Sequence, residues 1–193
     1  MRALRIRLVA AFAVVLAACG GAGAPADFPA GGGSSIPIDM RADQFSFANF
    51  SAKKTPEQFG TADVVAMFGD GPEVCSAGTG ESCRLAAEAA TWARMVNQAR
   101  QTGHCEGFAV MASARFTQKA SPPTGDLLNE GDVTHGIMRG FATQFERSVR
   151  DEADGWAAKS VGEKVLAVDK ALASGSLEYV LGVYTKNGGH AVL

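Results

Sequence analysis

The chain has 193 residues, of which 47% are apolar and 20% are charged, so it can bury one substantial core and one folded domain is expected. Its formal net charge of −2 hides an asymmetry, because Arg2, Arg5 and Arg7 lie at the extreme N-terminus and the rest holds 15 basic and 20 acidic residues. The sequence shows no basic patch with interleaved aromatic residues, so nucleic acid is not an expected partner. Three histidines without close carboxylate–histidine spacing predict neither a metal site nor a cofactor.

Residues 1–18 have the pattern of an export signal. A positive segment, residues 1–7, precedes an uninterrupted run of eleven apolar residues, Leu8–Ala18. That run is too short to span a bilayer, which needs about 20 residues. It ends in Leu16-Ala17-Ala18-Cys19-Gly20, which resembles a bacterial lipobox, where small residues precede a cysteine that is lipidated and becomes the mature N-terminus. The alternative is an ordinary signal peptide that is cleaved nearby, with Cys19 incidental.

Residues 19–35 consist mostly of Gly, Ala, Pro and Ser and hold little to bury, which predicts a flexible tether. The folded domain is then expected over residues 36–193. With a lipid such as palmitate on Cys19, the lipid bilayer becomes a partner of the chain. The expected location is the bacterial cell envelope, with the domain facing outward or into the periplasm.

The first helices of the domain are indicated by turn residues and apolar spacing. A helix is predicted to begin at Thr55-Pro56-Glu57, with the threonine as N-cap and the proline at the first helical position, and to end at Gly69. Apolar residues at intervals of four and three between Leu85 and Ala99 predict a second helix, which Gly103 ends. A third helix should begin at or just before Cys105 and stop at Ser121-Pro122-Pro123.

The later elements change from helical to extended character. A fourth helix and a fifth are predicted, the latter opened by a capping-box pattern at Ser160-Val161-Gly162-Glu163. A β-rich segment, Tyr179–Tyr184, a turn over residues 186–189 and a returning strand, His190–Leu193, follow. The sequence therefore predicts an α+β fold in which helices precede an antiparallel sheet. The apolar positions of these two helices are Ile137, Phe141, Phe145 and Val149, then Val161, Val165, Val168 and Leu172.

The cysteines divide into a pair and a remainder. Cys75 and Cys83 bracket a polar, glycine-containing loop, and an exported chain occupies a compartment that permits disulfides, so these two are predicted to pair. If Cys19 carries lipid, Cys105 is left over. An odd free thiol in an exported protein suggests a chemical role, and a buried inert cysteine is the alternative.

Cys105 and His190 have the features of a thiol–imidazole pair. An ordinary thiol has a pKa of about 8.5, whereas the thiolate is the nucleophile. A helix N-terminus carries partial positive charge and unpaired N–H groups, so Cys105 placed there beside an imidazole would gain a stabilised thiolate and a base. Gly103 and Gly107 are expected to leave room around the sulfur for a substrate backbone.

The residues around both positions resemble a known superfamily. Cys105-Glu106-Gly107-Phe108-Ala109 resembles the nucleophile helix of the papain-like cysteine peptidases, and Gly188-Gly189-His190-Ala191-Val192-Leu193 resembles their histidine strand. The segment from Ala171 to Val183 is similar to the helix, turn and strand that lead to that histidine. The resemblance covers about residues 85–193. It implies a monomeric cysteine hydrolase or acyl transferase of a compact bacterial branch, above all a peptidase acting on peptides or proteins, in which Cys105 attacks and His190 shuttles the proton.

The sequence also departs from that superfamily. Glu106 replaces the usual tryptophan, and Ala99 occupies the position of the oxyanion glutamine, for which Gln101 is the predicted substitute and Gln98 the other neighbour. The residue that orients the histidine from a later strand is missing after Leu193, so the domain is expected to be C-terminally incomplete.

Two other functions stay open. One is a non-catalytic envelope lipoprotein that uses a papain-like fold as a binding module, which the reactivity of Cys105 would distinguish. The other is a transglutaminase-like domain, which also has Cys before His but usually an aspartate soon after. His104 adjoins the nucleophile, but neighbouring side chains at a helix start point apart, so it is expected to lie in a loop or at an edge and not to act as the base.

Overall fold

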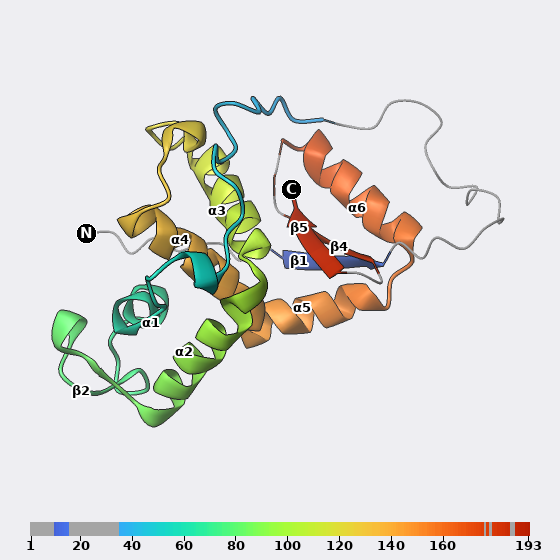
Figure 1. Cartoon of the computed structure of the whole chain (residues 1–193). Coiled ribbons are helices and arrows are strands. Elements are labelled where there is room, and N and C mark those ends of the chain that lie inside the picture. The colour runs from blue at the N-terminus through green and yellow to red at the C-terminus, as the bar shows by residue number, and fades with distance from the viewer. Residues whose placement is uncertain (1–9, 16–34, 176, 178, 186–187) are drawn as a thin grey trace.

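The computed structural model describes residues 10–15, 35–175, 177, 179–185 and 188–193. These residues form an α+β fold with six α-helices and two small β-sheets (Figure 1). The helices are α1 (Thr61–Phe68), α2 (Ala87–Ala99), α3 (Cys105–Gln118), α4 (Gly131–Ala142), α5 (Arg147–Ala157) and α6 (Val161–Ala173). Short 3-10 turns are η1 (Ala52–Lys54), η2 (Gly80–Ser82), η3 (Arg100–Thr102), η4 (Thr124–Asp126) and η5 (Thr143–Phe145).

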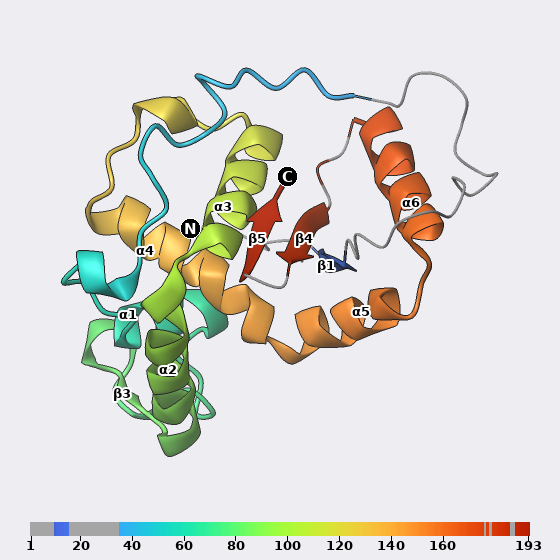
Figure 2. The same cartoon turned by 45° about the vertical axis from the view of Figure 1, so that its right-hand side comes forward.

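One sheet contains the predicted C-terminal hairpin. β4 (Tyr179–Thr185) pairs antiparallel with β5 (Gly188–Val192), and β1 (Ala10–Val15) runs parallel to the other edge of β4. The second sheet pairs β2 (Cys75–Ala77) with β3 (Arg84–Leu85). Figure 2 shows α3, β5, β4 and α6 side by side in that order, with α5 running below the sheet.

Most of the residues on which the export prediction rests lie outside the described residues. Strand β1 lies within the predicted apolar run of the signal peptide, whereas Cys19 and nearly all of the predicted tether lie outside the described residues. Over the part of the chain that is described, no helix is both long and apolar enough to cross a membrane. The lipid anchor and the location therefore stay predictions.

The predicted start of the first helix is wrong by five residues. The first helical residue of α1 is Thr61 and not Pro56, because the chain before it is held extended by a side chain of α2. Asn97 accepts the N–H of Phe59 at 3.1 Å and donates to the carbonyl of Phe59 at 2.7 Å. Those bonds satisfy the backbone of Phe59 as a neighbouring strand would, and Gly60 after it becomes the N-cap of α1.

The predicted fourth helix is two helices. Ile137 and Phe141 are buried in α4 and Val149 in α5, but the chain leaves helical geometry at Glu146, whose ψ of 140° is extended. The regular spacing thus continued across a break that the sequence pattern does not reveal. α2 and α3 start and end close to the predicted positions.

The fifth predicted helix, α6, begins as expected, but its expected apolar face is only partly buried. Ser160 and Glu163 form the predicted capping box, with Ser160 Oγ accepting the Glu163 N–H at 3.2 Å and Glu163 Oε2 accepting the Ser160 N–H at 2.8 Å. However, Val161 is 42% exposed and Val165 is 38% exposed. Val165, Val168 and Leu172 line an open pocket together with Leu181 of β4, so the expected apolar face is only partly covered.

The main core lies between α1, α2 and α4. Its members come from these helices and from the disulfide loop, and they pack with the half-buried Trp92 of α2. Asp63 of α1 is buried there but fully partnered: it meets His135 Nδ1 at 2.9 Å and Arg139 Nη1 at 3.0 Å, both on α4. This ionic cluster ties α1 to α4. The main buried residues are Phe59, Val64, Val74, Ala93, Val96, Met138, Phe141 and Ala142.

α3 and α4 cross in backbone contact. A Cβ on Gly107 would lie 2.0 Å from the carbonyl oxygen of Ile137, and one on Gly140 would lie 3.0 Å from the carbonyl oxygen of Gly107. Helices approach this closely only where side chains are absent at the crossing. Gly107 therefore makes room for α4, and not for a substrate as its position beside Cys105 had suggested.

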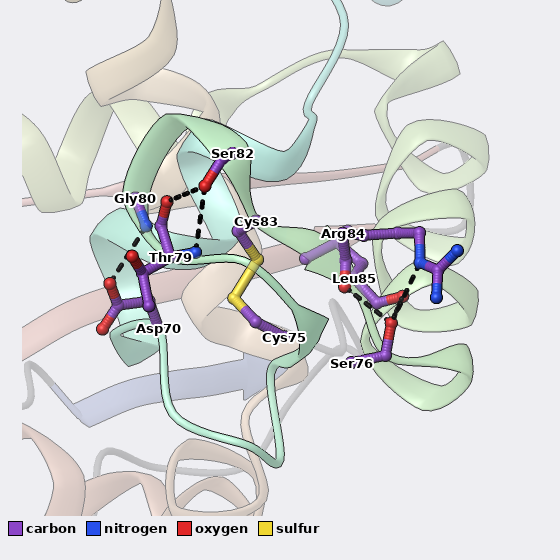
Figure 3. The surroundings of a disulfide bond; sticks show 9 residues. All are labelled: Asp70, Cys75, Ser76, Thr79, Gly80, Ser82, Cys83, Arg84 and Leu85. Carbon is purple, nitrogen blue, oxygen red and sulfur yellow. Dashed lines mark hydrogen bonds between the residues drawn. A yellow bond between two sulfur atoms is a disulfide. The ribbon is translucent and has the colours of Figure 1, made fainter.

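The predicted disulfide links Cys75 and Cys83 across eight positions of sequence (Figure 3). Its loop has internal hydrogen bonds, including Ser82 Oγ to the carbonyl of Thr79 at 2.8 Å and the N–H of Gly80 to Asp70 Oδ2 at 3.0 Å. Ser76 Oγ donates to the carbonyl of Arg84 at 2.9 Å on the facing strand. Both sulfurs belong to the main core, so the bridge joins the loop to α1 and α2.

Removing this bridge is expected to lower the free energy of unfolding by about 2–3 kcal/mol, because the unfolded chain regains the entropy of an open loop. The double variant Cys75→Ala/Cys83→Ala, unfolded in urea beside the oxidised wild type, measures the effect. Reduced wild-type protein serves as the control that keeps both side chains. Equal stability of the oxidised and reduced proteins would contradict the expectation.

Candidate functional site

Cys105 is the first residue of α3, as predicted from the sequence. Its thiol is half-buried and unpaired. α3 has 14 residues, so its N-terminal end presents free N–H groups and partial positive charge at the sulfur. The N-terminal end of α3 therefore lies at the free thiol.

The turn before Cys105 is held by a residue far away in the sequence. Gly103 has φ of 139°, in the region that favours glycine, and a Cβ there would come within 3.0 Å of Asn49 Nδ2. Asn49 Oδ1 accepts the backbone N–H of His104 at 2.8 Å. The Asn49 side chain thus caps the first turn of α3, one residue from Cys105.

His104 lies in the short connection between η3 and α3, and its ring is fully buried. Arg100 Nε donates to His104 Nε2 at 2.8 Å, and His104 Nδ1 lies 2.6 Å from the carbonyl of Phe50. Because a guanidinium can only donate, Nε2 accepts and Nδ1 carries the proton of a neutral ring. Burial lowers the pKa of His104, which favours the same neutral form. Both ring nitrogens are occupied, so His104 positions the turn and leaves no nitrogen for the thiol.

Arg100 connects His104 to the chain before α1. Its Nη1 donates to Asn97 Oδ1 at 2.8 Å and to the carbonyl of Glu57 at 3.1 Å, while Nη2 has no hydrogen-bond partner within the described residues. The side chain is fully buried, and burial lowers its pKa. A buried cation without a carboxylate contact is costly. The bonds of Arg100 to His104 and to the chain before α1 offset part of that cost and link the two segments.

Three phenylalanines from the same distant segment cover α3. The rings of Phe45, Phe47 and Phe50 lie 5.1, 5.5 and 5.7 Å from the ring of Phe108, all near edge-to-face. Such pairs contribute beyond the area they bury. Segment 45–50 therefore both packs on α3 and bonds the residue before its first turn.

Glu106, next to Cys105, is the unusual ionisable group of the site. It is 9% exposed, and burial raises its pKa to about 7. Among the described residues no hydrogen bond or ion pair reaches its carboxylate. Burial also raises the pKa of Tyr184, and the charges of Glu106 and Cys105 raise it further, so the phenol of β4 lies in the field of both.

His190 lies in β5 as predicted, but its side chain does not point towards Cys105 as that of a catalytic partner would. It is exposed and pairs with Val183, while Ala191 pairs with Gly182 and packs on Ala109 and Val110 of α3. Successive side chains alternate across a sheet, so with Ala191 toward α3 the imidazole points to the other face. The structure brings the strand of His190 to α3 but does not turn its ring toward Cys105, and the catalytic pair stays a prediction.

Gln101 is exposed in η3, and its Nε2 donates to the carbonyl of Asn97 at 3.4 Å. Its amide is thus directed to its own chain. Asn49 bonds the residue before Cys105, and sequence reasoning missed it because 55 positions separate it from His104. No local pattern could have identified it.

No group of three or more His, Cys, Asp or Glu side chains in the described ranges could hold a metal ion. Comparison of the chain with protein-family models, with curated proteins and with solved structures finds no match.

Proposed function

We propose that the protein is an exported, membrane-anchored cysteine hydrolase or acyl transferase with a papain-like domain, acting above all on peptide bonds. The observation that carries the proposal is the free, half-buried thiol of Cys105 at the first position of a 14-residue helix packed against the hairpin of His190. The lipid bilayer is the partner of Cys19, and a peptide or protein is the substrate of Cys105.

In the proposed reaction, His190 first takes the proton of the Cys105 thiol. The Cys105 thiolate attacks a carbonyl carbon, the new S–C bond forms as the carbonyl π bond becomes an oxyanion, and N–H groups at the start of α3 stabilise that charge. Collapse of the oxyanion expels the amine, which takes a proton from His190, and water then hydrolyses the thioester. An acceptor amine in place of water gives acyl transfer.

His190 serves this scheme only if its ring turns to the α3 side. The strand around it is short and contains Gly188 and Gly189, and glycine-rich strands specify their register weakly. A shift of β5 by one residue along β4 would exchange its two faces and bring the imidazole to the side of Cys105. The proposal therefore includes this register in the active protein.

The second candidate is a non-catalytic binding module, favoured by one observation: the exposed His190 faces away from α3 in the described register. A thiol without a base would then be a structural residue. The two candidates differ in the reactivity of Cys105.

Iodoacetamide labelling of Cys105, followed on its own proteolytic peptide by mass spectrometry, separates them. In an enzyme we expect labelling at pH 6 at least about tenfold faster than for free cysteine, because thiolate is the reacting form. The variant His190→Ala should lose that advantage, and Gln101→Ala should keep it. Labelling of the wild type at the rate of free cysteine would overturn the enzyme proposal and favour the binding module.

A further inference from the structure

A wide-open surface cavity of about 770 Å³ lies between α1, α2 and the start of α5. None of the residues assigned above to the thiol site lines it. Its apolar wall includes Phe68, Trp92 and Phe145, which come from α1, α2 and η5. The cavity is therefore a separate feature, large enough for several side chains of a ligand.

The aromatic wall is held in place by its own contacts. The ring of Trp92 lies 5.1 Å from that of Phe68 and 5.6 Å from that of Phe59, both edge-to-face. Phe145 packs on the core residue Phe141 at 5.5 Å. Aromatic faces attract cations as well as apolar groups, most strongly those of tryptophan.

The lining is strongly acidic. Four carboxylates, Glu73, Glu88, Glu146 and Asp151, line the cavity with a single cation, Arg147. The Arg147 side chain is 95% exposed and meets Asp151 only at 3.9 Å. Within the part of the chain that is described, no ion pair is formed by Glu73, Glu88 or Glu146. Glu146 is half-buried, and burial raises its pKa, so a cation there would relieve an unfavourable charge.

We propose that this cavity binds a basic peptide segment, with a lysine or arginine side chain seated on the aromatic wall and its charge among the carboxylates. The aliphatic stem of such a side chain suits the apolar wall, and its head group suits the acidic lining. Charge complementarity selects this occupant, because an acidic lining repels anionic lipid headgroups and nucleic acid phosphates. The proposal does not depend on Cys105.

Tryptophan fluorescence tests the proposal directly. The chain has two tryptophans, so Trp156→Phe leaves Trp92 as the reporter. The probe is the peptide acetyl-Ala-Lys-Ala-Lys-Ala-amide, compared with the same peptide carrying norleucine for lysine. We expect a saturable change in Trp92 fluorescence with the lysine peptide and none with the norleucine peptide. Added salt should weaken binding of the lysine peptide.

Glu88→Gln/Glu146→Gln should weaken binding of the lysine peptide about tenfold, since two partly screened charge contacts are lost. The matched control is Glu81→Gln/Glu130→Gln, two exposed carboxylates that do not line the cavity, and it should leave binding unchanged. If Trp156→Phe fails to fold, the indole N–H signal of Trp92 in the wild type, observed by NMR, replaces fluorescence. The proposal is overturned if the lysine peptide does not bind, if the norleucine peptide binds equally well, or if the lining variant binds unchanged.

Discussion

Gly107→Ala is expected to lower the free energy of unfolding by about 3 kcal/mol, because the added methyl meets backbone and not a movable side chain. Its Cβ would lie 2.0 Å from the Ile137 carbonyl oxygen and 2.8 Å from the Phe141 nitrogen, both on α4. Those atoms cannot turn aside, so α3 and α4 must separate and the core between α4 and α2 must loosen. Urea unfolding of the variant beside the wild type measures the loss.

Gly155→Ala is the matched control. Gly155 lies within α5, and a Cβ there would meet nothing within 4 Å. Alanine favours a helix over glycine by about 1 kcal/mol, so this variant should be slightly more stable than the wild type. If both glycine variants change stability by the same amount and in the same direction, the close helix crossing is not the reason that residue 107 is glycine.

Glu106→Gln is expected to stabilise the protein at pH 8 by up to about 3 kcal/mol and to have little effect at pH 4. Burial raises the pKa of Glu106 from 4.5 to about 7 in the folded protein. Below about pH 4.5 both folded and unfolded states hold the proton, so the carboxyl costs nothing extra. Between pH 4.5 and 7 the unfolded state releases the proton first, so stability falls as the pH rises, and above pH 7 the full cost is present.

Urea unfolding of wild type and variant at pH 4, 5, 6, 7 and 8 tests this sign, because other titrations cancel in the difference. The stability gap between the two proteins should open between about pH 4.5 and 7 and change little above pH 7. Cys105→Ser serves as the control, since it alters the neighbouring thiol and should keep the pH dependence of the wild type. A gap that is constant with pH would show that the Glu106 carboxyl is not held in an apolar environment.

The sequence predicted those structural features that depend on residues close together in the chain. The apolar stripe of α2, the start of α3 at Cys105, the capping box of Ser160, the C-terminal hairpin and the Cys75–Cys83 bridge all follow from neighbouring residues, and the structure has each of them. The break at Glu146 was missed because Phe145 and Val149 keep helical spacing across it.

The candidate site was less predictable because long-range contacts build it. The cap from Asn49, the neutral His104 and the burial of Glu106 depend on segments that meet only in the folded chain. The side of the sheet that His190 faces depends on register, and a shift of one residue reverses it. Residue types alone predict neither these long-range contacts nor the face of the sheet on which His190 lies.

The attachment of Asn49 and Phe50 to His104 has a consequence for how the thiol comes into place during folding. The two hydrogen bonds join residues 55 and 54 positions apart, so the intervening chain must first close a long loop. α3 can form by itself early, but its first turn is completed only when segment 45–50 docks. The same segment can undock without melting the main core between α1, α2 and α4, because its phenylalanines pack on α3. Amide exchange at His104 would therefore report the docking of segment 45–50 beside Cys105 separately from global unfolding.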